Sequence, residues 1–429
     1  MLIGYQSSAQ QHEMQIIVVL SVLIGLTQAT YVSTPSSLCF DKSFIFGVAT
    51  AAYQIEGAWN VSGKGESIWD RYTHARPDRI FDHKNGDVAA DSYHLFKEDV
   101  KRLVELNVQM YRFSISWPRI LPNGLSNEVS QDGIRYYTTL IDELVHHKIY
   151  PVVTMYHWDL PQPLQDLGGW TNPIIADYFV DYAKILFDNF GSKVPVWITF
   201  NEPLSFCQEG YGGTDAPGDK SSGFEDYLCG HNVLRAHGMF GWFAHPIFSK
   251  TGDYPYIMRK RVDAISRKQH FTRSRLPTFS SEEIEIIKGS ADFLGLNHYT
   301  TYLVVPWGFR KSLNWLRKAY NNPAVVITEN GMSLEKGLED VRRIKYIESY
   351  LKSLHTAVYK DQCNVYGYTY WSLIDNFEWT RGYSERFGLY EVDYDSPNKT
   401  RHRRMSAEYY SMLSRTKCIP TFEYIDNQI

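Results

Sequence analysis

The sequence predicts an α/β fold, a (β/α)8 TIM barrel that is incomplete because its fifth strand is missing. Three observations support this prediction. Short runs of β-branched and aromatic residues recur along the 429-residue chain, helical patterns separate them, and no linker or low-complexity segment divides the chain. Alternating units of this kind build a parallel sheet covered by helices, and its strands form continuous apolar runs because both faces are buried.

The expected elements follow one another from residue 44 onward. Seven apolar runs are typical of strands, at residues 44–50, 110–115, 151–156, 196–200, 293–296, 324–328 and 365–370. Helical spacing of apolar residues predicts helices over 94–106, 136–147, 178–190 and 341–358. A closed barrel of this type has eight strands, and the gap lies between residues 200 and 293, where only loop and helix patterns occur. An open sheet would leave the kind of strand edge that closed barrels avoid.

The N-terminal residues are interpreted as an export signal. Residues 16–25 form an apolar run without charge that is too short to span a bilayer, and Thr27-Gln28-Ala29 offers a cleavage site of small residues. Met14 lies directly upstream, so residues 1–13 are interpreted as an extension or an artefact of the gene model. The alternative to an export signal is a disordered N-terminal arm. We therefore expect an extension and signal peptide over residues 1–29. A single barrel domain is expected over residues 30–429, outside the cell.

Composition excludes several classes of function. The 44 Lys and Arg residues nearly balance 48 Asp and Glu residues, and the net charge of -4 gives no signal for a nucleic acid or polyanion partner. Histidines and cysteines do not show the spacing of metal ligands, and neither a phosphate-binding loop nor a convincing Ser-His-Asp order is present. We expect a small-molecule substrate and no cofactor, metal, nucleic acid or membrane partner, with the oligomeric state left open.

Five cysteines agree with an extracellular chain. Cys207 and Cys229 bracket a Gly-rich loop and are the expected disulfide pair, worth about 3 kcal/mol through loop closure. Cys39, Cys363 and Cys418 leave one cysteine over. Acceptor triplets for N-glycosylation of a secreted chain are present at Asn60-Val61-Ser62 and Asn398-Lys399-Thr400.

Two glutamates stand where two of the predicted strands end. Glu202 lies in Asn201-Glu202-Pro203 after the run 196–200, and Glu329 lies in Glu329-Asn330-Gly331 after the run 325–328. Barrels of this class build their active sites at the C-terminal ends of the strands. Cleavage of a glycosidic bond needs an acid whose pKa is raised by burial or by a nearby anion, and a carboxylate at the anomeric carbon. Each motif alone also fits a helix cap or a turn, but their joint occurrence favours a catalytic pair.

With these motifs the chain resembles glycoside hydrolase family 1, the retaining β-glucosidases. Residues 199–203 match the acid/base motif of the family, 327–331 match its nucleophile motif and 44–58 match its N-terminal signature. The similarity runs from about residue 40 to 410. The resemblance implies that Glu202 is the general acid/base and Glu329 the nucleophile, with their carboxyl groups about 5–5.5 Å apart.

The resemblance also implies the rest of the site. Arg112 would hold the nucleophile ionised, and Tyr299 would donate its hydroxyl to it. Taken alone, Arg112 could instead form a structural ion pair, and Tyr299, His157 or Trp158 could be core or packing residues. Polar contacts to sugar hydroxyls separate epimers, because a mismatched epimer leaves buried groups unpaired. The sugar-binding positions carried over from the family motifs are Gln54, His157, Trp158, Asn201, Asn297, Trp371, Glu378, Trp379 and Phe387.

Two segments expected from the resemblance are missing. After Ala236-His237-Gly238 the chain passes directly to Met239, without a fifth strand, and after Val304 it passes to Val305-Pro306, without a loop that helps wall the leaving-group site in the family. Two alternatives to an active retaining β-glycosidase therefore stay open. One is a silent or unstable secreted barrel, because losing a strand could exceed the about 5–15 kcal/mol by which domains are stable. The other is a myrosinase-like thioglucosidase, although the presence of Glu202 disfavours the glutamine-based mechanism of one such subgroup.

Overall fold

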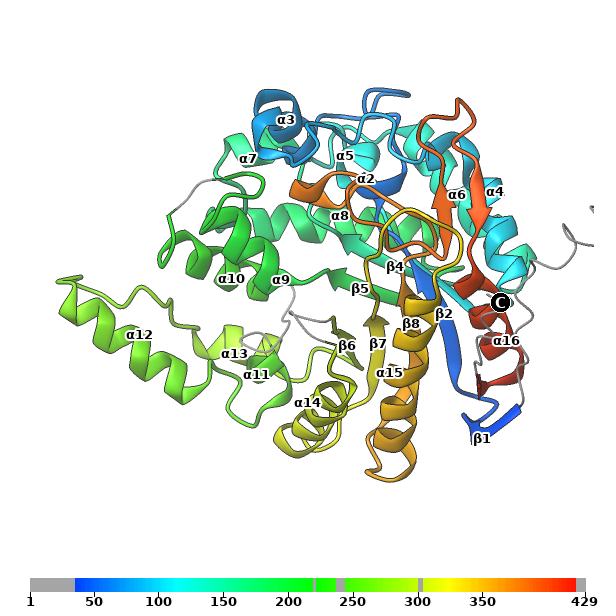
Figure 1. Cartoon of the computed structure of the whole chain (residues 1–429). Helices are drawn as coiled ribbons and strands as arrows, with labels where there is room; N and C mark the ends of the chain where they lie inside the picture. The colour runs from blue at the N-terminus through cyan, green and yellow to red at the C-terminus, as the bar shows by residue number, and fades with distance from the viewer. Residues whose placement is uncertain (1–34, 219–220, 237–243, 300–303, 422–429) are drawn as a thin grey trace, which may run out of the picture.

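The computed structural model describes residues 35–218, 221–236, 244–299 and 304–421. Its centre is a seven-stranded parallel sheet that forms an open barrel (Figure 1). β2 pairs with both β3 and β8, so the first and last strands of the barrel are neighbours. All seven strands predicted from the sequence are confirmed. In spatial order they are β5 (Val196–Phe200), β4 (Tyr150–Tyr156), β3 (Met110–Ser114), β2 (Ile45–Ala49), β8 (Val365–Trp371), β7 (Val325–Glu329) and β6 (Leu294–Asn297).

The barrel stays open between β5 and β6, which are the two edges of the sheet. In the described part of residues 201–293, which leaves out 219–220 and 237–243, the chain forms helices and loops but no strand. Among the described residues, the strand that is lacking is therefore the fifth of the barrel, which would lie between β5 and β6, as predicted. Every residue of β3 is buried, whereas β6 buries only Leu294 and β5 buries only Ile198 and Phe200. The two edge strands are less buried because each lacks a neighbour on one side.

Helices surround the sheet on its outer side (Figure 1). The expected helix over 136–147 begins earlier, at Gln131, because the Ser130 side chain accepts a hydrogen bond from the Gly133 backbone at 3.1 Å and caps the helix before its apolar pattern starts. The long helices outside the gap are α4 (Ser92–Glu105), α6 (Gln131–His146), α8 (Ile175–Phe190), α14 (Pro306–Ala319), α15 (Val341–Tyr359) and α16 (Met405–Thr416). The helices between β5 and β6 are α9 (Pro203–Ser205), a π-helix (Phe206–Tyr211), α10 (Glu225–Ala236), α11 (Ala244–Phe248), α12 (Tyr256–Lys268) and α13 (Ser281–Ile287).

Shorter elements complete the chain. The short α-helices are α2 (Ala52–Ile55), α3 (Ile68–Ala75), α5 (Trp117–Ile120) and α7 (Gln162–Asp166). The 3₁₀-helices span Pro77–Arg79, Gly169–Thr171 and Trp379–Arg381. Two small antiparallel pairs lie outside the barrel: β1 (Pro35–Cys39) with β11 (Cys418–Pro420), and β9 (Tyr390–Val392) with β10 (Arg401–Arg403). Within the described residues, no helix has the length and apolar character needed to cross a membrane.

Apolar side chains from several strands fill part of the barrel interior. Met110, Val152 and Ile198, from three neighbouring strands, form one buried cluster. Gly47 leaves room for it, because a Cβ atom at this position would lie 2.4 Å from Cγ of Met110. A packed interior of this kind leaves the C-terminal ends of the strands as the place for polar side chains and a cavity.

The structure contains two disulfide bonds and one free cysteine among the described residues. Cys207 and Cys229 are joined, as the sequence predicts, and link the π-helix to α10. Cys39 and Cys418 are joined across 379 residues of sequence and link β1 to β11. Cys363 is the cysteine left over, and it is buried.

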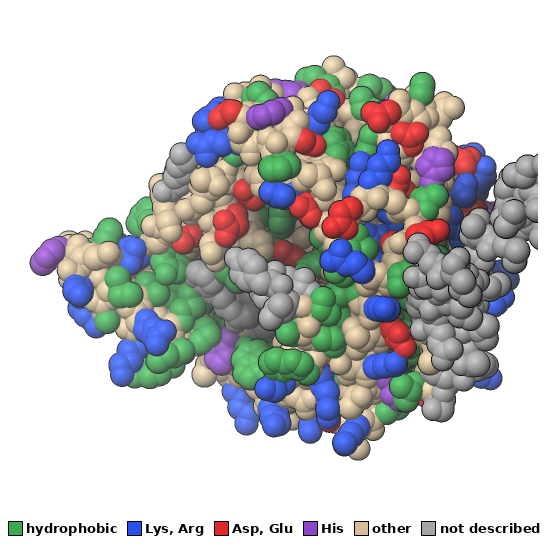
Figure 2. All heavy atoms as spheres, in the orientation of Figure 1, with side chains coloured by type: hydrophobic (Ala, Val, Ile, Leu, Met, Phe, Trp, Pro, Cys, Tyr) green, Lys and Arg blue, Asp and Glu red, His purple; other side chains and the backbone are tan. Residues whose placement is uncertain are grey.

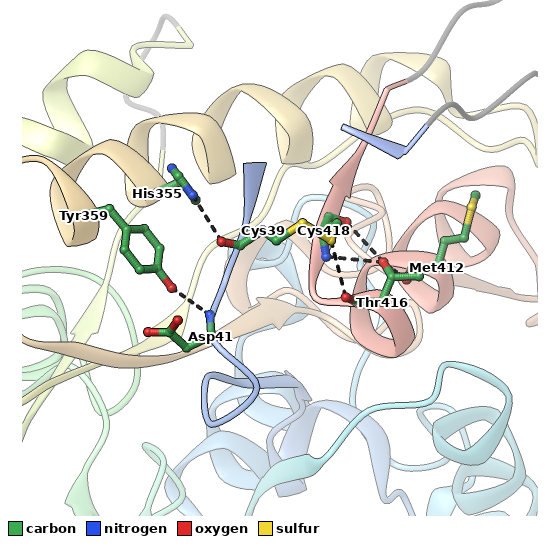
Figure 3. The surroundings of a disulfide bond; sticks show 7 residues. All are labelled: Cys39, Asp41, His355, Tyr359, Met412, Thr416 and Cys418. Atoms are coloured by element: carbon green, nitrogen blue, oxygen red, sulfur yellow. Dashed lines mark hydrogen bonds between the residues drawn. A yellow bond between two sulfur atoms is a disulfide. The ribbon is translucent and has the colours of Figure 1, made fainter. Parts of the chain in front are cut away.

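The surroundings of the long-range disulfide tie it to α15 (Figure 3). The Asp41 backbone donates a hydrogen bond to the Tyr359 hydroxyl at 2.7 Å, and the His355 ring lies 3.2 Å from the Cys39 carbonyl oxygen. The disulfide therefore fastens both ends of the described chain to the outside of the barrel, beside the helix that joins β7 to β8.

Candidate active site

A cavity of 370 Å³ is lined by residues at or just beyond the C-terminal ends of the barrel strands. Figure 2 shows acidic side chains gathered around a hollow in this face of the molecule. Eleven predicted site residues line the cavity: Gln54, His157, Trp158, Asn201, Glu202, Tyr299, Glu329, Trp371, Glu378, Trp379 and Phe387. The other two, Arg112 and Asn297, hydrogen-bond to lining residues. The structure therefore brings all the predicted site residues to one place.

Three lining residues were missed by the sequence analysis. Gly331, Met332 and Ser333 complete the wall of the cavity. Their position directly after Glu329 is the sequence feature that could have predicted them as lining residues. Gly331 is required here, because a Cβ atom would lie 2.0 Å from the Trp371 carbonyl oxygen.

Glu329, at the end of β7, is only 3% exposed and is held through both carboxyl oxygens. Arg112 donates from Nη1 to Oε1, and the Tyr299 hydroxyl donates to Oε2 at 2.5 Å. Burial raises the pKa of Glu329 to about 7, although Arg112 and Tyr299 both lower it. Burial, and then the negative charge of Glu329, hold the pKa of Tyr299 well above its usual range, so this hydroxyl keeps the proton that it donates. At neutral pH Glu329 is therefore partly protonated.

Glu202 follows β5 in a conformation that few residues adopt. Its backbone lies in the left-handed region, with φ 43° and ψ 61°, and Pro203 begins α9 directly after it. Asn297 donates from Nδ2 to Oε1 of Glu202 at 2.8 Å, and the Ser205 hydroxyl donates to Oε2 at 2.9 Å. Left-handed backbone at a residue other than glycine costs about 1–3 kcal/mol and is common at active sites. Two further lining residues share this feature, Trp158 (φ 77°) and Trp379 (φ 52°).

Arg112 also orders the polar groups beside Glu329. It donates from Nη2 to Oδ1 of Asn201 at 2.8 Å and from Nε to Oγ1 of Thr154 at 3.0 Å. Because Oδ1 of Asn201 is an acceptor, its Nδ2 faces Nε2 of His157 at 2.9 Å, and this ring nitrogen must accept. Burial holds the pKa of His157 well below its usual range, so the ring is neutral and carries its proton on Nδ1. That Nδ1 has no hydrogen-bond partner among the described residues.

Gln54 and Glu378 form a second polar pair at the cavity. Gln54 donates from Nε2 to Oε2 of Glu378 at 3.2 Å and to the Phe377 carbonyl oxygen at 2.9 Å, while its Oε1 has no partner among the described residues. Burial, and then the negative charges of Glu329 and Glu202, raise the pKa of Glu378 to about 8. The residues that line the cavity therefore include Gln54 with an unpaired buried acceptor, His157 with an unpaired buried donor and, at neutral pH, Glu378 with a protonated carboxyl. These are the partners that hydroxyl groups require.

Aromatic rings supply the apolar part of the cavity. The Trp371 and His157 rings are nearly parallel, with centroids 5.9 Å apart and an angle of 20°. The Trp158 and Trp379 rings lie 4.6 Å apart. Apolar walls with a few convergent polar groups are typical of sites for small polar ligands. Within the described residues, histidines, cysteines and acidic residues do not group in a way that could hold a metal ion.

Comparison with known proteins identifies relatives over most of the chain. Myrosinase 1 of Brevicoryne brassicae is 43% identical over 460 residues, which cover 88% of this chain and 98% of that protein. Cytosolic beta-glucosidase of Cavia porcellus is 36% identical, covering 88% of this chain and 98% of that protein. The solved structure of aphid myrosinase superimposes with a TM-score of 0.86 at 42% identity, covering 88% of this chain and 99% of that one. A family 1 b-glucosidase from Thermotoga maritima gives a TM-score of 0.81 at 34% identity, covering 89% and 99%.

The family model for glycosyl hydrolase family 1 matches residues 36–241, 238–305 and 301–419. The three matches meet at 238–241 and 301–305, the two positions where the sequence analysis places missing segments. The alignment with Myrosinase 1 agrees, because it extends over 460 residues although it covers 88% of a 429-residue chain. Several tens of residues of that relative therefore have no counterpart here. This chain belongs to glycosyl hydrolase family 1.

Proposed function

We propose that this chain hydrolyses terminal, non-reducing β-D-glycosides by double displacement, with Glu329 as nucleophile and Glu202 as general acid/base. One observation carries the proposal. Both carboxyl groups line the same cavity at the ends of β7 and β5, and both oxygens of each accept side-chain hydrogen bonds. A pair of held carboxyl groups facing one sugar-sized cavity is what a retaining glycosidase requires.

The reaction follows from these placements in two steps. In the first, the Glu329 carboxylate attacks the anomeric carbon while Glu202 gives its proton to the leaving oxygen, so that the aglycone departs and a glycosyl ester forms on Glu329. In the second, the Glu202 carboxylate takes a proton from water, and the water oxygen displaces Glu329 from the anomeric carbon. Arg112 and Tyr299 stabilise the charge on Glu329 as it leaves.

We further propose that the remaining lining residues recognise the sugar. The Nδ1 proton of His157 and Oε1 of Gln54 face hydroxyl groups, because both are otherwise unpaired in the described structure. Glu378 adds a carboxyl to the same side, and Asn201 and Asn297 lie beside the catalytic glutamates. Trp371 forms the platform below the ring, and Trp158, Trp379 and Phe387 form the other apolar walls.

The missing fifth strand is the reason to keep the silent barrel as an alternative. Activity is supported because the site residues come from the remaining strands and the loops after them, and the predicted contacts between them are formed. A myrosinase-like activity is supported by the name of a 43% identical relative. The presence of Glu202 as a general acid favours O-glycosides, because a thioglucoside leaving group needs little protonation.

The experiment measures p-nitrophenol release from an aryl β-glucoside and then traps the intermediate with a 2-fluoro glucoside. Turnover and a covalent label mapped to Glu329 are the expected results, and Glu329→Gln should abolish both. Glu285→Gln, at an exposed position on α13, is the matched control and should keep both. A folded preparation without turnover would favour the silent barrel, and a label on another residue would reject Glu329 as nucleophile.

We also propose that the chain is a secreted, N-glycosylated protein whose single barrel domain begins near residue 30. The predicted signal at residues 1–29 lies outside the described residues. Support comes from the two disulfides, which persist in oxidising compartments, and from the exposed side chains of Asn60 and Asn398. Expression in a secreting eukaryotic cell should yield a glycosylated product in the medium, and retention of an unglycosylated chain would contradict this.

A further inference from the structure

A chain of side-chain hydrogen bonds reaches Glu202 from the residue before the nucleophile. The Thr328 hydroxyl donates to Oδ1 of Asn297 at 2.7 Å, and Nδ2 of Asn297 donates to Oε1 of Glu202 at 2.8 Å and to Oδ1 of Asn201 at 3.0 Å. Thr328 is 4% exposed and is absent from the cavity lining. It can therefore act on the reaction only through its neighbours.

The contacts permit only one orientation of the Asn297 amide. Both partners of its Nδ2 are acceptors, because one is a carboxyl oxygen of Glu202 and the other is the Asn201 oxygen that already accepts from Arg112. The Asn297 oxygen must then face Thr328, whose hydroxyl supplies its donor. Gly295 leaves space for this hydroxyl, because a Cβ atom there would lie 2.9 Å from the Thr328 methyl group and 3.1 Å from Oγ1.

The Ser205 hydroxyl, at the end of α9, donates to the other oxygen of Glu202 at 2.9 Å. The position of the Glu202 side chain depends strongly on these two hydrogen bonds, because the strand and backbone that carry it give little other support. In the part of the chain that the structure describes, β5 is an edge strand with no neighbour toward the gap, and the Glu202 backbone is in the left-handed region. With neither a strand on that side nor a relaxed backbone, side-chain hydrogen bonds are what aim the carboxyl group.

We infer that Thr328 and Ser205 are positioning residues that aim the Glu202 carboxyl at the leaving oxygen, Thr328 acting through Asn297. This inference rests on the proposed role of Glu202 as acid/base. Proton donation by the acid speeds bond cleavage when the leaving group is a poor anion. It contributes little to the rate when the leaving group is already a stable anion. A misaimed acid therefore lowers kcat/KM for phenyl β-glucoside and spares 2,4-dinitrophenyl β-glucoside.

The test measures kcat/KM, which reports the first chemical step, for a series of aryl β-glucosides from phenyl to 2,4-dinitrophenyl. Thr328→Val removes the hydroxyl and keeps the shape. We expect it to lower kcat/KM by about tenfold or more for the phenyl substrate, since general acid catalysis contributes about 10²–10⁴-fold, and by less than about twofold for the dinitrophenyl substrate. Thr328→Ser should restore most of the loss. Ser205→Ala should show the same dependence on the leaving group, with rescue by Ser205→Thr.

Three outcomes would overturn the inference: an equal loss on all substrates, no loss on any, or a failure of Thr328→Ser to rescue. Thermal unfolding of each variant separates a folding defect from a catalytic one, and Ser205→Ala decides the matter if Thr328→Val does not fold. Glu202→Gln is the benchmark. If it does not itself show a leaving-group-dependent loss, the proposed acid/base role fails. If Glu202→Gln shows that dependence and both positioning variants lack it, the inference alone fails.

Discussion

Replacing Arg112 by Met should weaken both folding and catalysis in a way that depends on pH. The guanidinium of Arg112 and the carboxyl of Glu329 form an ion pair whose side chains are 2% and 4% exposed. Methionine keeps much of the length of the side chain and removes the charge and all donors. It leaves Glu329, Thr154 and Asn201 without this partner.

The magnitude has two parts. Each acceptor left unpaired in a buried place costs about 1–3 kcal/mol of the free energy of unfolding at every pH, and Asn201 keeps its hydrogen bond from Asn297. The second part depends on charge. The pKa of Glu329 is raised to about 7, above its unfolded value, so the stability contributed by its bound proton is complete below the unfolded pKa and is lost as pH rises through 7. Without Arg112 the pKa of Glu329 rises further. Above pH 7 the free energy of unfolding of the variant therefore falls by up to about 1.4 kcal/mol more per pH unit than that of the native protein.

The assay is denaturant unfolding at pH 6 and pH 8.5, together with the pH profile of kcat/KM. We expect a larger destabilisation at pH 8.5 than at pH 6. We also expect the acid limb of the activity profile to move to higher pH, because Glu329 ionises at higher pH in the variant. Arg119→Met is the matched control. It breaks the buried pair with Glu56 outside the cavity, and should destabilise without moving the acid limb. Equal destabilisation at both pH values, or an unmoved acid limb in Arg112→Met, would refute the reasoning.

Three further predictions concern other parts of the molecule. Glu378, whose pKa is raised to about 8, contributes stability that is lost between its unfolded pKa and pH 8. Glu378→Gln should therefore raise the free energy of unfolding at pH 8.5 by up to about 5 kcal/mol and leave it nearly unchanged at pH 4.5; equal effects at both pH values in urea unfolding would contradict this. Gln54→Met should lower kcat/KM for aryl β-glucosides by about tenfold or more, because it removes the unpaired acceptor Oε1. An unchanged free energy of unfolding is the control that the variant is folded. Replacing Cys39 and Cys418 by Ser should cost about 2–5 kcal/mol in thermal or urea unfolding, because their bond closes a 379-residue loop, and should leave KM unchanged; an unaltered unfolding midpoint would show that the bond does not form.

Much of the barrel could be predicted because strand and helix patterns depend on near neighbours in the sequence. The run before Glu329 and the run before Glu202 both become strands whose ends approach the same cavity, as their parallel order requires. The start of α6 was placed five residues late, because its cap at Ser130 precedes the apolar pattern. The disulfide between Cys207 and Cys229 was predictable because only 22 residues separate them.

The sequence by itself determined the order of the strands along the chain, the lack of a strand pattern between residues 200 and 293 and the two carboxyl groups at strand ends. Only the tertiary structure decided the pairing of Cys39 with Cys418, the proton position on His157 and the amide orientation of Asn297. It also decided that burial outweighs Arg112 and raises the pKa of Glu329 to about 7. The reason is physical. A hydrogen-bond partner or a desolvated charge depends on groups that folding brings together from distant strands, and no local pattern in the sequence encodes their distances.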